Sequence, residues 1–185
     1  MVSVKNISIK QIFSCTVALL LIIFSNAQPI PFLIGVVIVS VGEAIRFWAA
    51  GHLRKDKSLT ITGPYAYVKN PLYLGTLLVT VGTCLCAYNF IILAFGLAIL
   101  FFQYLPYKLK KEGARLEKIF GEEYIAYAKQ VPNLIPKLTP YRNEISLTEG
   151  KEVKKWSYEQ VKGNSEHLTF LAILMGIILI SRKLW

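Results

Sequence analysis

The stretch GPYAYVKNPLYLG, residues 63–75, lies between two apolar runs of membrane length. Its second half predicts a helix start, because Asn70 is a good N-cap residue and Pro71 fits the first helical position, where a backbone N–H would have no partner. Such a start directs free N–H groups, about those of Leu72 and Tyr73, back toward the membrane surface, where they attract an anionic group. The alternative is a capped membrane helix that binds nothing.

The composition assigns the chain to the integral membrane class. Hydrophobic residues make up 54% of the 185 residues, the mean hydropathy is +0.47, and several apolar runs approach the ~20 residues that cross a bilayer. The net charge is +10. We nevertheless expect no nucleic-acid partner, because the basic residues cluster beside apolar runs, where topology and anionic lipid explain them.

Cysteine and histidine residues are scattered and do not suggest a metal site. Cys15, Cys84 and Cys86 all fall inside apolar runs, with neither a disulfide framework nor ligand spacing. His52 and His167 stand alone. We therefore expect buried, inert thiols and no metal.

The pattern of apolar runs predicts a single all-α integral membrane domain over residues 1–185. It has four to five transmembrane helices and a cytosolic C-terminal, Pro-rich extension that closes a cofactor pocket. The predicted spans are about 12–26, 31–50, 71–87 and 89–106, followed by cytosolic helices and a lid at 107–141, a polar linker at 142–166 and a short apolar helix at 167–181. The first run ends in a small-x-Ala sequence, so cleavage of a signal peptide is the alternative to a first span. The last run is short, so a fifth span and an interfacial helix both remain open.

The distribution of basic residues predicts the orientation. Arg54, Lys55, Lys57 and Lys69 follow the second run, whereas the connections 25–30 and 87–90 carry no charge. The positive-inside rule then makes this a multi-pass protein whose 51–70 loop, and with it the active site, faces the cytosol.

Two charged residues interrupt the second apolar run. Glu43 and Arg46 are three residues apart and therefore share one face of a helix. Charged groups in a membrane helix pair with each other or face a cavity. Both interpretations, an ion pair and the lining of a polar pocket, are open.

A second block of sequence begins at Lys108. Apolar residues at helical spacing alternate with charges and predict an amphipathic helix, and a short helix at 122–130 places Tyr124 and Tyr127 on one side. Pro132, Pro136 and further prolines then impose an extended path that is suited to a lid.

Together, the two blocks resemble the isoprenylcysteine carboxyl methyltransferase family and its relatives among small membrane phospholipid methyltransferases. The GPY at 63–65 and KNPLYLG at 69–75 are similar to the family's G-x-Y and R-H-P-x-Y-x-G. The second block, similar to E-E-x-x-L-x-x-x-F-G-x-E-Y-x-x-Y-x-x-x-V-P, consists of Glu112, Leu116, FGEEY at 120–124, Tyr127, Val131 and Pro132. The resemblance covers about residues 57–136.

The resemblance implies transfer of a methyl group from S-adenosylmethionine to a lipophilic acceptor that enters from the bilayer. The acceptor is open between an isoprenylcysteine-like carboxylate, a lipid amine and a thiol. Carried over from the motifs, the cofactor contacts fall on Lys57, Ser58, Leu59, Thr60, Tyr65, Asn70, Pro71, Leu72, Tyr73 and Glu112. Lys108 falls where a basic residue orients the acceptor, so Lys108 and Glu112 are the expected catalytic residues.

Three departures from the family pattern limit this transfer. Lys69 and Asn70 replace Arg-His, and an Asn side chain can form hydrogen bonds but cannot titrate. Gly113 replaces a second acidic residue. Lys108 replaces an Arg and offers a point charge instead of a bidentate fork. Lys108 and Glu112 are also spaced i,i+4, as in a pair that only supports the helix.

Two other classes of function remain alternatives. One is a membrane reductase of isoprenoid or sterol double bonds that uses NADPH, and the other is a non-catalytic membrane module of the same fold. The sequence offers no nucleophile–base pair, which direct methyl transfer does not need, because positioning of the reactants supplies much of the rate.

Overall fold

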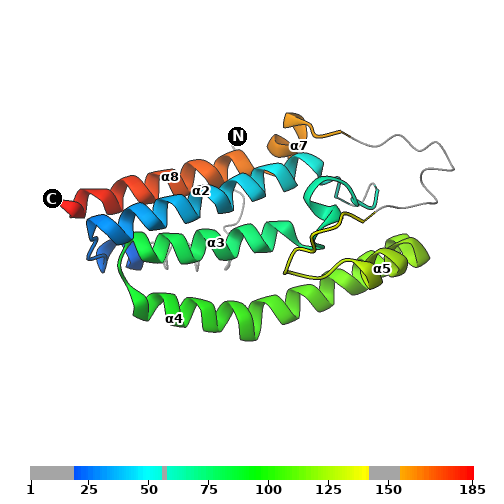
Figure 1. The fold of residues 1–185 in the computed structure, drawn as a ribbon, viewed down its shortest axis with the longest axis horizontal. Helices are drawn as coiled ribbons and strands as arrows, with labels where there is room; N and C mark the ends of the chain where they lie inside the picture. The colour runs from blue at the N-terminus through cyan, green and yellow to red at the C-terminus, as the bar shows by residue number, and fades with distance from the viewer. Residues whose placement is uncertain (1–18, 56–57, 142–154) are drawn as a thin grey trace, which may run out of the picture.

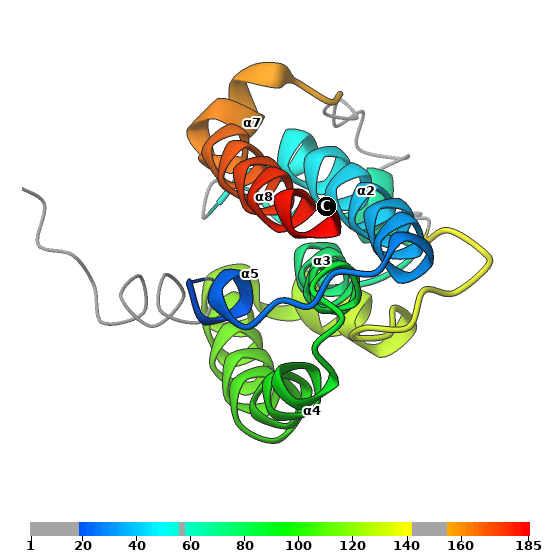
Figure 2. The same cartoon turned by 90° about the vertical axis from the view of Figure 1, so that its left-hand side faces the viewer.

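The computed structural model describes residues 19–55, 58–141 and 155–185. Over these residues the chain is helical and contains no strand, as the sequence predicts (Figure 1). The main helices are α2 (Pro29–His52), α3 (Pro71–Cys86), α4 (Phe90–Ile99), α5 (Leu105–Gln130), α7 (Tyr158–Gly163) and α8 (Glu166–Ser181). Seen along the bundle, α3 lies between α2 and α4 (Figure 2).

Three helices are long and apolar enough to cross a membrane. They are Pro29–His52 with 24 residues, the continuous helix Phe90–Gln130 with 41 residues, and Glu166–Leu184 with 19 residues. The predicted span at 71–87 forms α3, an apolar helix of 16 residues. At ~1.5 Å per residue it is about 24 Å long, shorter than the ~30 Å hydrocarbon core. Of the predicted span at 12–26, residues 12–18 lie outside the described residues and 19–23 are helical.

Glycines on α2 and α3 allow these two helices to pack closely. A Cβ on Gly35 would lie 2.5 Å from the Gly82 carbonyl oxygen, and one on Gly42 would lie 2.9 Å from the Gly75 carbonyl oxygen. Both pairs are reciprocal, and the two glycines of each helix are seven residues apart, so they lie on one face of their helix. Membrane helices often associate in this way, because small residues bring the backbones together.

The last apolar run forms α8, which begins one residue before the predicted helix at 167–181 and ends at the same residue. α8 lies beside α2 (Figures 1 and 2) and continues into the 3₁₀ turn η3 (Arg182–Leu184). Lys183 Nζ donates to the Ile23 carbonyl oxygen at 2.6 Å. This carbonyl ends the 19–23 helix, where the backbone carries partial negative charge. The Lys183 ammonium group is therefore paired with backbone oxygens at this end of the bundle.

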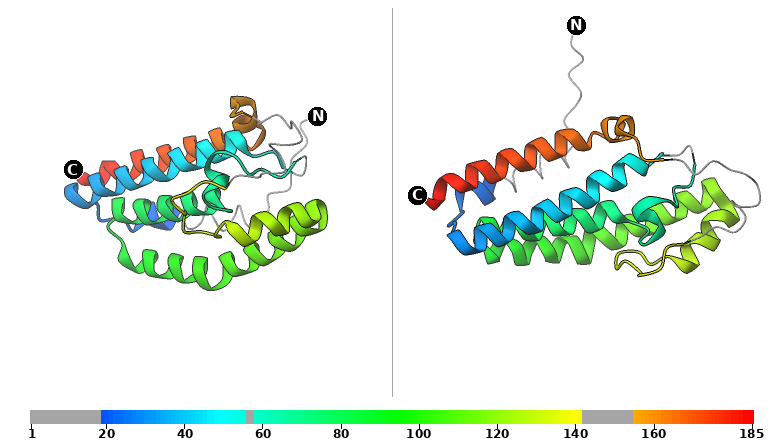
Figure 3. Two further views of the ribbon diagram at one scale, coloured as in Figure 1. Left: turned by 45° about the vertical axis from the view of Figure 1, so that its right-hand side comes forward. Right: turned by 45° about the horizontal axis from the view of Figure 1, so that its top comes forward.

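The segment predicted as a polar linker at 142–166 is ordered in its last part. Residues 142–154 lie outside the described residues, but α7 forms at the C-terminal end of α2 (Figure 3). Asn164 Nδ2 donates to the Ala50 and Leu53 carbonyl oxygens at 3.0 and 3.2 Å, and Trp156 covers Gly51, where a Cβ would lie 1.9 Å from the indole Nε1. The linker prediction is therefore wrong for residues 155–165, which clamp the end of α2.

A π-turn, η2 (Leu100–Tyr104), joins α4 to α5. Pro106 follows it and has no N–H for the regular i→i−4 pattern, and a π-turn is one way in which a helix adjusts to such an interruption. Farther along, Gly121 has φ 53° and ψ −129° inside α5. This positive φ, which suits glycine, breaks α5 into the long and short helices that the sequence predicts.

Candidate functional site

The start of α3 differs in detail from the predicted cap. Asn70 occupies the N-cap position, but its side chain does not cap the helix; its Nδ2 donates to the Asn133 carbonyl oxygen at 3.2 Å. The amide of Tyr73 donates to the Asn70 carbonyl oxygen at 3.1 Å. Within the described residues, the Leu72 amide forms no backbone hydrogen bond. Of the two predicted free N–H groups, only that of Leu72 is available to a ligand.

The Pro-rich segment 131–141 lies along residues 65–69 and joins the two sequence blocks. Backbone hydrogen bonds of 2.8–3.0 Å run from Lys69 N to Pro132 O, from Lys137 N to Tyr67 O and from Tyr141 N to Ala66 O. The Tyr127 hydroxyl also donates to the Tyr65 carbonyl oxygen at 2.7 Å. Blocks that are about 60 residues apart in the sequence therefore form one structural unit.

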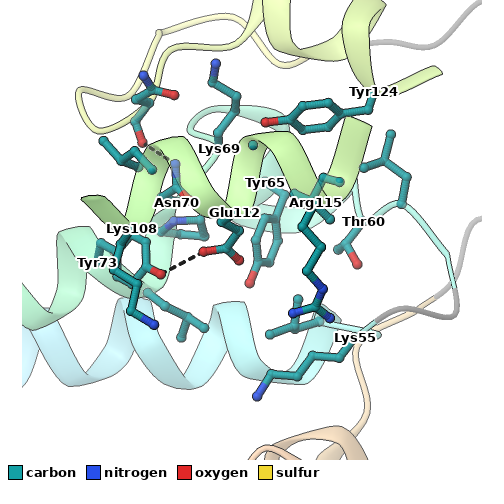
Figure 4. Close-up of a pocket in the computed structure, with 18 of the residues that line it drawn as sticks. Lys55, Thr60, Tyr65, Lys69, Asn70, Tyr73, Lys108, Glu112, Arg115 and Tyr124 are labelled. Carbon is teal, nitrogen blue, oxygen red and sulfur yellow. Dashed lines mark hydrogen bonds between the residues drawn. The ribbon is translucent and has the colours of Figure 1, made fainter. Parts of the chain in front are cut away.

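A pocket of about 480 Å³ opens between this unit and α5 (Figure 4). Its lining includes all the predicted site residues that the structure describes: Ser58, Leu59, Thr60, Tyr65, Asn70, Pro71, Leu72, Tyr73, Lys108 and Glu112. Lys57 lies outside the described residues. The structure thus brings both predicted groups, from the start of α3 and from α5, to one cavity.

Glu112 is the one acidic residue in the described lining of the pocket. Its Oε2 accepts a hydrogen bond of 2.7 Å from the Tyr73 hydroxyl (Figure 4). Lys108 and Glu112 form no salt bridge within the described chain. The carboxylate is therefore oriented toward α3 by Tyr73, which differs from a pair that only supports its own helix.

Lys108 belongs to an aromatic group at the start of α5. Its Nζ lies 5.8 Å from the centroid of the Tyr104 ring, within reach of a cation–π interaction. The Tyr104 and Tyr73 rings meet edge to face at 6.2 Å. Tyr73 therefore contacts both Glu112 and the aromatic support of Lys108.

Basic side chains dominate the remainder of the pocket lining. They are Arg54, Lys55, Lys69, Lys108, Lys111 and Arg115. Lys69 Nζ donates to the Ala128 carbonyl oxygen at 3.1 Å, and burial lowers the pKa of this amine. Burial, together with the nearby Tyr127 and Glu112, raises the pKa of Tyr65, so its hydroxyl stays protonated and available as a donor. The charged groups of the described lining are therefore mostly positive.

Sequence reasoning missed several residues of the pocket. Tyr104, Lys111 and Arg115 follow the three- and four-residue spacing of Lys108 and Glu112, so extending that helical pattern would have found them. Arg54 and Lys55 have no such signal. Gly113 faces Tyr124, whose hydroxyl oxygen would be 3.3 Å from a Cβ at that position.

Glu43 and Arg46 do not line the pocket and form an ion pair. Arg46 Nε lies 3.3 Å from Glu43 Oε1, although this contact lacks hydrogen-bond geometry, since both atoms are buried without such a partner. Arg46 Nη2 also donates to Glu166 Oε2 at 2.6 Å. The ion-pair interpretation is confirmed, with an additional carboxylate from α8 that the sequence did not indicate.

No group of three or more potential metal ligands among His, Cys, Asp and Glu occurs in the described part of the chain.

Several known proteins are similar to about half or more of this chain. "Protein-S-isoprenylcysteine O-methyltransferase" of Schizosaccharomyces pombe is 33% identical over 99 residues, which are 53% of this chain and 41% of the relative. The B form from Arabidopsis thaliana is 30% identical over 114 residues, 55% and 57% of the two chains. "Cobalt-zinc-cadmium resistance protein CzcN" of Cupriavidus metallidurans is 30% identical over 123 residues, 65% and 56% of the two chains.

This chain thus spans about half the length of the curated relatives it matches. No solved structure matches it significantly. The profile of the phospholipid methyltransferase family matches residues 16–123, more than half of the chain. The resemblance predicted from the two blocks is confirmed, and the chain belongs to the phospholipid methyltransferase family.

Proposed function

We propose that this protein is an integral membrane methyltransferase that uses S-adenosylmethionine to methylate a lipophilic acceptor at the cytosolic face of the membrane. The observation that carries the proposal is the convergence of both family blocks on one pocket beside the apolar helices. The names of the relatives support methyl transfer to a lipid-modified group.

The chemistry of the pocket fits this cofactor. Its volume of about 480 Å³ lies within the ~300–1,000 Å³ that is typical of small-molecule sites. The Leu72 amide and the positive end of α3 suit the cofactor carboxylate. Glu112, held by Tyr73, suits a cationic part of the cofactor, and the Tyr65 and Tyr73 rings offer aromatic faces to it. When bound, the cofactor supplies an electrophilic methyl group on a sulfonium.

The charge of the lining favours an anionic acceptor. Lys108, with the other basic side chains, attracts and orients an acceptor carboxylate and repels an ammonium group. A carboxylate also needs no base, because it carries no proton to remove before it receives a methyl group. Of the acceptors that the family resemblance leaves open, an isoprenylcysteine-like carboxylate therefore fits best. The remaining task of these residues is to align the reactants, which supplies much of the rate in such reactions.

The arrangement of the helices supports a pocket at the membrane surface. We place five crossings in the membrane, at the first apolar run, α2, α3, the helix that begins with α4, and α8. Segment 131–141, hydrogen-bonded along residues 65–69, then covers the pocket as a lid. The concentration of basic residues at this end supports a cytosolic location for the pocket.

The proposal is tested by ligand-dependent unfolding of the full chain in detergent. S-adenosylhomocysteine, the demethylated product, should raise the midpoint of thermal unfolding, and at ~100 times its Kd it should stabilise the protein by about 2.7 kcal/mol. NADPH should not. No shift with saturating S-adenosylhomocysteine contradicts the proposal, and a shift with NADPH alone supports the reductase instead.

A further inference from the structure

A buried polar cluster lies where α2, α3 and α8 meet. Arg46 is at its centre, with Nη2 donating to Glu166 Oε2 at 2.6 Å and Nη1 donating to Thr76 Oγ1 at 2.5 Å. The third neighbour is Glu43, 3.3 Å from Arg46 Nε. Only 9–12% of these three charged side chains is exposed. Buried charges are costly, so such a cluster in a membrane bundle is a candidate for a specific role.

The cluster continues to the pocket through Thr76. The Thr76 hydroxyl accepts from Arg46 and donates to the Leu72 carbonyl oxygen at 2.8 Å. Leu72 lines the pocket and belongs to the first turn of α3. A polarised series of hydrogen bonds, in which each bond strengthens the next, thus runs from α8 to the candidate cofactor site.

The guanidinium group suits this position because of its shape. Its planar fork presents Nη1 and Nη2 in fixed directions, so Arg46 holds Glu166 and Thr76 together, which a lysine could not do in the same geometry. A threonine hydroxyl that donates to the i−4 carbonyl oxygen also bends a helix slightly. Fixing the hydroxyl of Thr76 therefore sets the shape of the first turn of α3.

We propose that Glu166 is a positioning residue of the cofactor site, which acts through Arg46 and Thr76 on the first turn of α3. Glu166 lies in α8, outside residues 16–123 that match the family. In this chain, α8 would therefore help to position the residues of the cofactor site. The inference rests on the proposed function, because it concerns the N–H group of Leu72 that would receive the cofactor carboxylate.

Two matched variants of the full chain in detergent test the proposal. Glu166→Met removes the link, whereas Glu43→Met makes the same change in the same cluster but leaves the Glu166–Arg46–Thr76 contacts intact. Each leaves one carboxylate paired with Arg46, so neither creates an unpaired buried charge. The Kd for S-adenosylhomocysteine should rise roughly 3- to 30-fold in Glu166→Met, the range for residues that couple two sites, and less than about 2-fold in Glu43→Met. Glu166→Gln should recover much of the affinity, since its amide oxygen still accepts from Arg46.

Hydrogen exchange of the ligand-free protein supplies a second measurement. Amides of residues 71–76 should exchange faster in Glu166→Met than in wild type, and at the wild-type rate in Glu43→Met. Equal effects of both variants on Kd and exchange, or no effect of either, overturn the proposal, because the cluster then contributes only stability. If wild type binds no S-adenosylhomocysteine, the proposed function fails, and exchange alone decides whether Glu166 shapes the start of α3. If Glu166→Met does not fold, Thr76→Val, which removes the hydroxyl between Arg46 and the Leu72 carbonyl oxygen, takes its place in both measurements, and wild-type values for it then overturn the proposal.

Discussion

At the scale of single residues, the Glu112 carboxylate decides which charges a ligand of the pocket can carry. It is one carboxylate among many cations, and its hydrogen bond to Tyr73 keeps it directed across the cavity. The pair therefore provides a fixed negative charge in a positive pocket, which suits a ligand that has both a cationic and an anionic end.

Neutralising Glu112 should weaken cofactor binding. Glu112→Gln should reduce the binding free energy of S-adenosylhomocysteine by about 1.5–3 kcal/mol, the range for hydrogen bonds to charged groups, as measured by calorimetry in detergent. Glu117→Gln is the control, because Glu117 is exposed on the same helix and does not line the pocket. Equal affinities of both variants would show that Glu112 does not contact the ligand.

Replacing Lys108 should lower methyl transfer to the acceptor and leave cofactor binding unchanged. Lys108→Met should leave the Kd of S-adenosylhomocysteine within about 2-fold of wild type and lower methyl transfer to farnesylated N-acetylcysteine about 10-fold or more, since a charged contact is worth at least ~1.4 kcal/mol. Lys110→Met, an exposed substitution two residues away, is the matched control. Phosphatidylethanolamine is the amine probe. Activity on it that survives Lys108→Met, without activity on the carboxylate, would assign the amine as the acceptor.

At the scale of helices, the close contact of α2 and α3 should be the most sensitive to added volume. A Cβ on Gly35 would lie 2.5 Å from the Gly82 carbonyl oxygen, which is backbone and cannot rotate away. Gly35→Ala should therefore destabilise the protein by about 1–3 kcal/mol, the usual cost of overpacking. Thermal unfolding in detergent measures the difference.

Gly176 supplies the control for this substitution. Nothing lies within 4 Å of a Cβ at Gly176 on α8, so Gly176→Ala should be neutral or stabilise by up to ~1 kcal/mol through helix propensity. Equal destabilisation by both substitutions would mean that helix propensity or lipid contact, not the α2–α3 interface, governs the response.

Most helix positions could be predicted, because they depend on local sequence features. The apolar runs gave α2, α3 and the helix that begins with α4, and Asn70-Pro71 marked the start of α3 correctly. The side chain of Asn70 was wrongly expected to cap that helix, because its partner, Asn133, lies 63 residues away. The clamp formed by residues 155–165 was missed for the same reason, since its partners are backbone oxygens at the end of α2.

The candidate site could be predicted as a set of residues but not as a geometry. Family spacing identified the residues that line the pocket, whereas the Tyr73–Glu112 bond joins residues 39 positions apart. The contact of Arg46 with Glu166 joins residues 120 positions apart. Neither leaves a periodic pattern in the sequence. Such long-range pairs depend on how the helices pack, which the 3.6-residue period does not encode.

At the scale of the whole molecule, the two ends of the bundle differ in character. At one end, Asn89 Nδ2 donates to the Phe24 carbonyl oxygen, the Asn26 amide donates to the Ala87 carbonyl oxygen, and Lys183 binds the Ile23 carbonyl oxygen. These are uncharged connections with one cation held on backbone oxygens. The other end carries the basic pocket. By the positive-inside rule, we expect the pocket end to face the cytosol.

The orientation is tested by a cysteine placed at each end in a background without Cys15, Cys84 and Cys86. α8 contacts Arg46 near the C-terminal end of α2 through Glu166, and the connection before α2 through Lys183. Its two ends therefore lie at the two ends of α2, and if α2 crosses the membrane, α8 must cross as well. An impermeant maleimide added to intact cells should label Trp185→Cys, which is fully exposed at the far end, and should label Ser58→Cys only after the cells are opened. Labelling of both sites only in opened cells would make α8 an interfacial helix and contradict the five-crossing arrangement, whereas labelling of Ser58→Cys from outside would reverse the orientation.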